Sequence, residues 1–167
     1  MIFAMVGTNE TPFDRLLLAL DAAAIDEEMI VQCGSSSVQP QGARCIESIR
    51  YEDLGEFVRQ ARAVVSHGGV GAILTALANH KHPIIFPRLH RFAEAVDDHQ
   101  LVFARRLEEA GLITLAENAE QLARTIRAPS TAVSLKLEAD PRLVAELREF
   151  VKESLAGHPG RGVPSTA

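Results

Sequence analysis

The sequence predicts an α/β domain in which helices cover both faces of a parallel sheet. Short apolar segments, typical of buried strands, alternate with helix-forming segments along most of the chain. Glycine or proline follows several of these strand segments directly. In folds of this class ligands bind beyond the carboxyl ends of the strands. The loops after the strands are therefore expected to share one ligand-binding edge: residues 7–11, 34–42, 66–71 and 87–94.

The first half of the chain is expected to hold four strands and two helices. The strand segments are 2–6, 29–33, 44–49 and 63–66. The first helix should begin near Thr11 as N-cap, with Pro12 in its first turn. Its apolar side chains then fall on one face, which should pack on the sheet: Phe13, Leu16, Leu17 and Leu20. The second helix is a short one over 52–61.

The second half continues the alternation of helix and strand. The expected helices are 70–79, 94–110 and 119–127, and the expected strands are 83–86 and 112–115. Gly111 is placed as the C′ residue that ends the long helix. A loop over 128–139 precedes a last helix over 140–156, and the Pro- and Gly-rich tail 157–167 is expected to be disordered. Residues 1–156 thus form one predicted domain.

The composition argues against several classes of protein. The formal net charge of −5 is opposite to that of a general nucleic-acid binder. Cys33 and Cys45 are the only cysteines and show neither metal-type spacing nor a disulfide framework, which fits a reducing, cytoplasmic compartment. The sequence shows no signal peptide and no apolar run of the ~18 residues that a membrane-spanning helix needs. Any work at a membrane would require a partner.

The stretch "SHGGVGAILTALA" (66–78) is the strongest sign of a binding site. Gly68, Gly69 and Gly71 lie between a strand and a helix, where free N–H groups and the helix dipole favour an anion. A phosphate or diphosphate would suit this turn, although the glycines could equally serve a tight turn alone. The sequence contains no GxxxxGK[ST] motif, and Leu74 occupies the third glycine position of a dinucleotide fingerprint.

Other polar residues are expected on the same edge. Gly7-Thr8 ends the first strand, and Asp98-His99-Gln100 could reach sugar hydroxyls, although Asp97 and Asp98 could simply be helix-start charges. A basic cluster beyond a strand is well placed for anionic oxygens: Arg88, His90 and Arg91. No metal site is expected, since the histidines at 80, 82 and 90 have no accompanying cluster of acids or cysteines.

Three segments together resemble the glycosyltransferase family 28 C-terminal domain: "FAMVGTNETPFDRLLLAL", "VVSHGGVGAILTAL" and "HPIIFPRLHRFAEAVDDHQLVFARRLEEAGL". The resemblance covers about residues 1–127. It is closest to stand-alone versions of the domain, which are catalytic subunits of two-part UDP-sugar glycosyltransferases, and "PR…EAVDDHQ" favours the bacterial exopolysaccharide type. The resemblance implies a Rossmann-like sheet that forms the nucleotide-sugar half of a GT-B enzyme.

The resemblance also implies roles for individual residues. His67, as the catalytic candidate, and the turn 68–71 would face the diphosphate, and Gly7-Thr8 would line the cleft floor. Gln100, with Asp98 and His99, would face the sugar, while Arg88 and Glu94 belong to the bacterial signature and are assigned to the nucleotide-sugar site. Thr75 stands where many relatives have a glutamate that holds the ribose, so ribose binding is expected to be weaker or differently supplied.

The family pattern further implies a cytoplasmic subunit held at the membrane by a membrane-anchored, acceptor-binding partner. The partner would bind a lipid-linked acceptor, and the donor would be a UDP-sugar with no further cofactor. No confident general base can be assigned, and the base could lie on the partner. Three alternatives remain: a non-catalytic nucleotide-sugar-binding subunit, an enzyme of another class such as a UDP-sugar epimerase, and a doubly wound domain whose glycines are purely structural.

Overall fold

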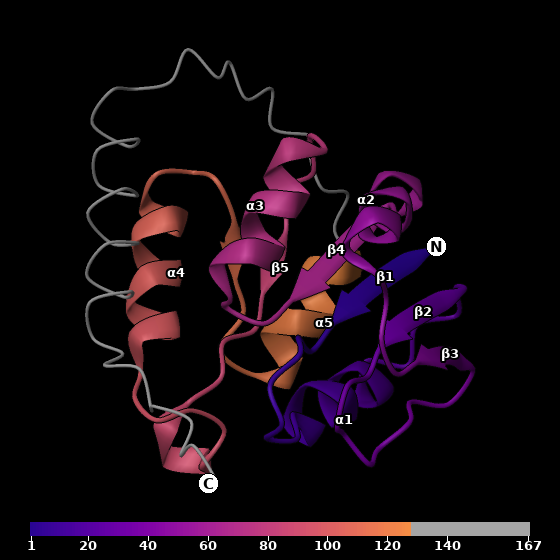
Figure 1. Cartoon of the computed structure of the whole chain (residues 1–167), viewed down its shortest axis with the longest axis horizontal. Coiled ribbons are helices and arrows are strands. Elements are labelled where there is room, and N and C mark those ends of the chain that lie inside the picture. Colours follow the sequence, from indigo (N-terminus) through magenta and orange to yellow (C-terminus); the bar gives the residue numbers. More distant parts are fainter. Residues whose placement is uncertain (128–167) are drawn as a thin grey trace, which may run out of the picture. The chain divides into compact units, whose positions relative to one another are not determined.

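The computed structural model describes residues 1–127, and within them it shows the predicted α/β architecture. A six-stranded sheet has the order β3-β2-β1-β4-β5-β6, and every pair of neighbouring strands is parallel (Figure 1). The strands are β1 (Ile2–Met5), β2 (Met29–Gln32), β3 (Ala43–Ile46), β4 (Ala63–Ser66), β5 (Ile84–Ile85) and β6 (Thr114–Leu115). The helices are α1 (Asp14–Ala22), α2 (Tyr51–Gln60), α3 (Val70–Ala78), α4 (His99–Glu109) and α5 (Ala119–Arg127), with a 3-10 turn at η1 (His90–Phe92).

The two sides of the central strand β1 build two separate cores. Because side chains alternate along a strand, Ile2 and Ala4 point to one face while Phe3 and Met5 point to the other. The first face packs against α1 and α5, and the second packs against α2 and α3. Helices therefore cover both faces of the sheet, as predicted. No helix within residues 1–127 is long and apolar enough to cross a lipid bilayer.

The first helix starts later than predicted. It begins at Asp14, and Thr11 is not its N-cap. The helix start is fixed instead by the loop after β2, because the Asp14 carboxylate accepts hydrogen bonds from the N–H and the hydroxyl of Ser37, both at 3.0 Å. The N–H of Phe13 likewise donates to Ser36 Oγ at 2.8 Å. Contacts with a distant loop thus replace the local cap.

The helix expected over 94–110 is five residues shorter at its start, because α4 begins at His99. The preceding segment instead forms η1 and turns at Ala93, whose φ is +56°. Glu94 is drawn into the interior by Arg15, which removes it from the helix. Gly111 ends α4 as predicted, with a φ of +70°. The last predicted helix, 140–156, and the tail lie outside the described residues.

Candidate functional site

The carboxyl ends of β1 and β4 meet at a histidine that is held between two glycines. A Cβ atom on Gly7 would lie 2.6 Å from His67 Nε2, and one on Gly69 would lie 2.3 Å from the same atom. No side chain fits at such distances, so the imidazole ring occupies the space that both glycines leave. Two of the predicted cleft glycines, Gly7 and Gly69, therefore leave the space that the His67 ring occupies.

Gly68 has a different neighbour. A Cβ there would lie 2.7 Å from Gln100 Cβ, so this glycine lets α4 approach the turn. Gln100 Oε1 accepts hydrogen bonds from the N–H groups of Gly68 and Arg88, both at 3.1 Å. The side-chain amide oxygen thus joins the loops that follow β4 and β5. Its amide nitrogen has no hydrogen-bond partner within residues 1–127, and Gln100 does not line the cavity described below.

Gly71 is the glycine of this turn with open space before it. Nothing in residues 1–127 lies within 4 Å of the position that its Cβ would take. It occupies the first turn of α3, whose leading N–H groups have no partner inside the helix. No side chain caps this helix, since the N-cap residue is Gly69. The start of α3 therefore offers uncapped N–H donors to an open space.

That space is a cavity of about 320 Å³, which we call the glycine cleft. Its residues come from the ends of β1, β2 and β4, from the first turns of α2 and α3, and from the segment before α2. The lining includes the predicted residues Gly7, Thr8, His67, Gly69, Gly71 and Thr75, together with Met5, Gln32, Ile49, Tyr51, Leu54 and Ala72. The structure thus brings together in one cleft six residues that the sequence singled out.

His67 is uncharged at neutral pH. Burial of the ring, with a smaller contribution from the positive charge of Arg88, lowers its pKa from 6.5 to about 4. A neutral imidazole can donate or accept a hydrogen bond, but it adds no positive charge to the cleft. Any anion bound here would be held mainly by backbone N–H groups.

Thr75 lies at the wall of the cleft and is 8% exposed. Its hydroxyl donates to the carbonyl oxygen of Gly71, one helical turn earlier, at 2.8 Å. The hydroxyl hydrogen is therefore engaged inside α3, while the oxygen can still accept a bond.

Arg88 and Glu94 lie beneath the loops and not on the cleft surface. Arg88 is 1% exposed, and its guanidinium donates to the carbonyl oxygens of Val6 at 3.1 Å and Thr11 at 2.8 Å. Glu94, 5% exposed, accepts two hydrogen bonds from Arg15. Arg88 thus holds the loop after β1, Glu94 holds Arg15 of α1, and neither side chain reaches the lining of the cleft.

Asp98 and His99 are exposed and also lie outside the cleft lining. Asp98 accepts a hydrogen bond from the N–H of His90 at 2.8 Å, and His99 pairs with Asp97. These contacts shape the loop before α4. Within residues 1–127 no cluster of His, Cys, Asp and Glu could hold a metal ion.

The sequence reasoning missed one wall of the cleft. Ile49, Tyr51 and Leu54 supply an apolar side, and Tyr51 is 78% exposed. Gln32 was also missed; it is buried, and it accepts a bond from the N–H of Gly7 at 3.0 Å while donating to the carbonyl oxygen of Gly7 at 3.1 Å. The sequence around Tyr51 carries no signal that marks it as a site residue.

Solved structures of similar fold are glycosyltransferases of about twice this length or more. MurG of Acinetobacter baumannii matches with a TM-score of 0.58 and 15% identity, over 92% of this chain and 49% of that one. The glycosyltransferase SnogD of Streptomyces nogalater gives 0.56 and 23%, over 93% and 43%. Arabidopsis thaliana UGT89C1, solved with UDP-L-rhamnose, gives 0.55 and 14%, over 93% and 38%. The chain thus spans less than half of each of these structures.

No curated protein sequence matches the chain. The family model of the glycosyltransferase family 28 C-terminal domain, in contrast, matches residues 1–150. At the identities above, the structural neighbours establish a shared fold, the Rossmann-like half of GT-B enzymes. The match to the family model covers most of the chain, and the chain therefore belongs to the glycosyltransferase family 28 C-terminal domain family.

Proposed function

We propose that this chain is the UDP-sugar-binding catalytic subunit of a split GT-B glycosyltransferase. It would transfer a hexose or hexuronic acid from UDP to a lipid-linked saccharide acceptor, in exopolysaccharide or glycan synthesis. The observation that carries the proposal is the glycine cleft, in which the uncapped start of α3 opens beside Gly71 into a cavity of about 320 Å³. The family membership supports the same class of ligand.

The lining of the cleft suggests how the donor would bind. The diphosphate would lie at the first N–H groups of α3, where the helix dipole favours negative charge. The uracil ring would pack on the apolar wall, with Tyr51 as an aromatic surface. The ribose would approach the oxygen of Thr75. The sugar would extend beyond the lining of the cleft and meet the amide nitrogen of Gln100.

The chemistry follows from the leaving group. Transfer breaks the bond between the sugar and the β-phosphate of UDP, so negative charge develops on the diphosphate. Backbone N–H groups at the start of α3 and a hydrogen bond from neutral His67 would stabilise that charge. A general base must remove the proton of the acceptor hydroxyl. We assign no such base within residues 1–127 and place it on the partner.

We propose a membrane-anchored partner that binds the acceptor and holds this chain at the cytosolic face of the membrane. A second candidate function is a non-catalytic, nucleotide-sugar-binding subunit of such a complex. Thr75 favours this second function, because its hydroxyl already donates to Gly71 and it cannot hold the ribose with two carboxylate oxygens as a glutamate would. The test of this second candidate is sugar transfer by this chain reconstituted with its partner. If the wild type transfers sugar, and His67→Ala abolishes transfer while still binding the partner, the non-catalytic function is rejected.

Calorimetric titration of UDP, with AMP as the control nucleotide, tests the donor site. We expect the wild type to bind UDP and Gly71→Leu to lose at least about tenfold in affinity, because the new side chain would fill the cleft. Gly55→Ala is the matched control, since Gly55 also lies in a helix but outside the cleft lining. Equal binding of UDP by both variants, or no preference for UDP over AMP, would contradict the proposed site.

A further inference from the structure

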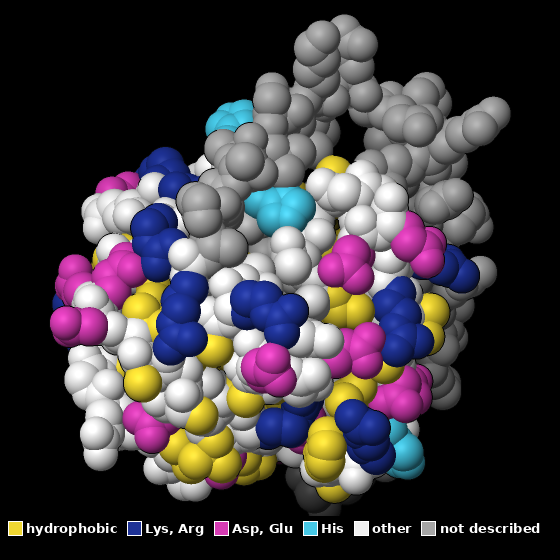
Figure 2. All heavy atoms as spheres, turned by 180° about the vertical axis from the view of Figure 1, so that it is seen from behind, with side chains coloured by type: hydrophobic (Ala, Val, Ile, Leu, Met, Phe, Trp, Pro, Cys, Tyr) yellow, Lys and Arg dark blue, Asp and Glu magenta, His cyan; other side chains and the backbone are white. Residues whose placement is uncertain are grey.

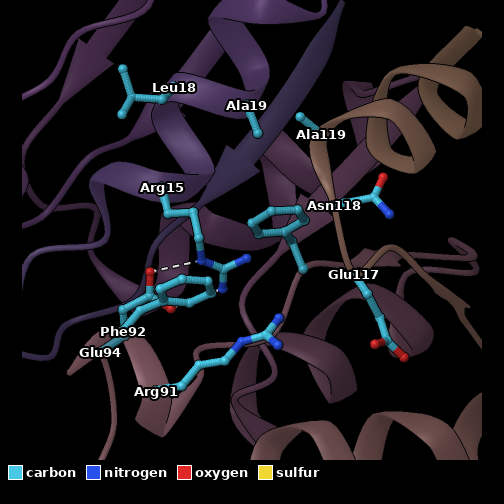
Figure 3. Close-up of a pocket in the computed structure, with 10 residues that line it drawn as sticks. Arg15, Leu18, Ala19, Arg91, Phe92, Glu94, Glu117, Asn118 and Ala119 are labelled. Atoms are coloured by element: carbon cyan, nitrogen blue, oxygen red, sulfur yellow. Dashed lines mark hydrogen bonds and ion pairs between the residues drawn. The ribbon is translucent and has the colours of Figure 1, made fainter.

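A second and larger cavity lies on the opposite face of the sheet from the glycine cleft. It measures about 590 Å³ and is enclosed by α1, the end of β5, the η1 loop and the start of α5 (Figure 3). Apolar side chains line much of it, including Phe86, Ala19 and Ala119. Leu18 and Phe92 also line it and are 55% and 49% exposed. We call this cavity the arginine pocket, after the two arginines in its lining, Arg15 and Arg91.

The first of these arginines is held by several contacts, which leave one nitrogen of its guanidinium without a hydrogen bond. The guanidinium of Arg15 lies 4.4 Å from the ring centre of Phe86 and 4.9 Å from that of Phe92. Its Nε and Nη2 atoms each donate to the carboxylate of Glu94 at 2.8 Å, and Nη2 also donates to the carbonyl oxygen of Pro87 at 2.6 Å. The remaining nitrogen, Nη1, has no hydrogen-bond partner within residues 1–127.

The second arginine has no carboxylate partner among the described residues. Arg91 lies with its guanidinium 4.8 Å from the ring centre of Phe92, and Figure 3 shows it directed into the cavity toward Arg15. The other acid in the lining, Glu117, is paired with Arg105 at 2.9 Å. The carboxylates of Glu94 and Glu117 are therefore both engaged by arginines other than Arg91.

This arrangement leaves the positive charge of Arg91 without a carboxylate partner over the ring of Phe92, in a chain whose formal net charge is −5. Figure 2, which views the molecule from behind, shows basic, acidic and apolar side chains interspersed on the surface of this side. Because Glu94 compensates the charge of Arg15, the uncompensated charge at the cavity is that of Arg91, and an anion there could pair with Arg91 while it accepts a hydrogen bond from Nη1 of Arg15. The apolar lining favours a ligand with a hydrocarbon part, and the volume lies in the usual range for a small-molecule site, roughly 300–1,000 Å³.

We propose that the arginine pocket binds an amphiphilic anion, a phosphate or carboxylate head group on an apolar chain. The head group would lie against Nη1 of Arg15 and the guanidinium of Arg91. The chain would lie over Phe86 and along the exposed sides of Leu18 and Phe92. This site is separate from the glycine cleft and requires no nucleotide. The proposal therefore stands or falls independently of the proposed donor site.

Calorimetric titration of octyl phosphate into the full chain, below the micelle-forming concentration, tests the proposal. We expect saturable binding that Arg91→Gln weakens at least tenfold, because the variant loses a charge-assisted hydrogen bond to the head group. Arg106→Gln is the matched control, because Arg106 is an exposed arginine outside the pocket. Ala119→Leu, which adds bulk to the lining, should also weaken binding.

Three comparisons make the result specific. Inorganic phosphate alone and neutral octanol should each bind much more weakly than octyl phosphate, because each lacks one half of the recognised chemistry. Octanoate distinguishes a carboxylate from a phosphate source of the head group. Equal thermal midpoints of Arg91→Gln and wild type would show that folding is intact. Absence of octyl phosphate binding by the wild type, or equal weakening in Arg91→Gln and Arg106→Gln, would overturn the proposal.

Discussion

Replacing Gly69 by alanine should destabilise the domain through a single steric contact. The new Cβ would lie 2.3 Å from Nε2 and 2.9 Å from Cδ2 of His67. The ring cannot move away freely, because Gly7 lies against it, with its own Cβ position only 2.6 Å from the ring. The backbone angles of Gly69, φ −73° and ψ 130°, suit any residue, so the cost is one of packing. Overpacking of this kind costs roughly 1–3 kcal/mol of unfolding free energy.

Gly71→Ala is the matched control for that substitution. Apart from its chain neighbours and the backbone of its own helix, no atom of residues 1–127 lies within 4 Å of its Cβ position, and an alanine in a helix is more stable than a glycine by roughly 0.5–1 kcal/mol. Urea unfolding followed by circular dichroism should therefore shift the two variants in opposite directions. A Gly69→Ala stability within about 0.5 kcal/mol of wild type would refute the reasoning. The reasoning would also be refuted if the double variant Gly69→Ala/His67→Ala lost as much stability as the two single variants together. The free-energy effects of residues in contact are not additive, so removing the ring should relieve the loss caused by Gly69→Ala.

Two further predictions concern protonation. Hydrogen bonds from Arg62 and the amino group of Met1 lower the pKa of Glu27 from 4.5 to about 2, so the contribution of Glu27 to folding stability is complete above pH 4.5 and is lost as the pH falls toward 2. Glu27→Gln should therefore lower the free energy of unfolding by roughly 1–2 kcal/mol at pH 7, after discounting for solvent screening, whereas the exposed control Glu28→Gln should not. Urea unfolding of both variants at pH 7 and pH 3 measures the difference. The lowered pKa of His67, about 4, predicts that its ring resonances in NMR stay those of the neutral form from pH 8 to pH 5, and a midpoint near 6.5 would contradict the burial argument.

The strand and helix pattern could be predicted because burial on a parallel sheet leaves a local trace. β1, β2 and β4 are buried along their whole length and read as apolar runs. The start of α4 could not be predicted in this way. Glu94 suits a helix start by its type, but in the fold its carboxylate pairs with Arg15, 79 residues earlier in the chain. A contact of that sequence separation leaves no local signal.

The site residues likewise fall into those with a local signal in the sequence and those whose place depends on distant contacts. Residues of the turn 66–71 could be singled out because several glycines lie together between a strand and a helix, although that pattern alone left a purely structural turn equally open. Arg88 could be recognised as notable, but its burial among carbonyl oxygens depends on how the loop after β1 folds around it. Tyr51 was overlooked because an aromatic residue at a helix start is ordinary until the cleft beside it is known.

The four glycines that follow β1 and β4 at this edge are explained by two kinds of cause. Gly7 and Gly69 leave space for the ring of His67, and Gly68 leaves space for Gln100, so the packing of the protein itself requires all three. Gly71 is different, because no neighbour in residues 1–127 would touch a side chain there, and alanine would make the helix more stable. We take a residue that costs stability and that packing does not require as support for the proposed ligand, which would need the space. The diphosphate proposal therefore rests on Gly71 more than on the glycine-rich appearance of the turn.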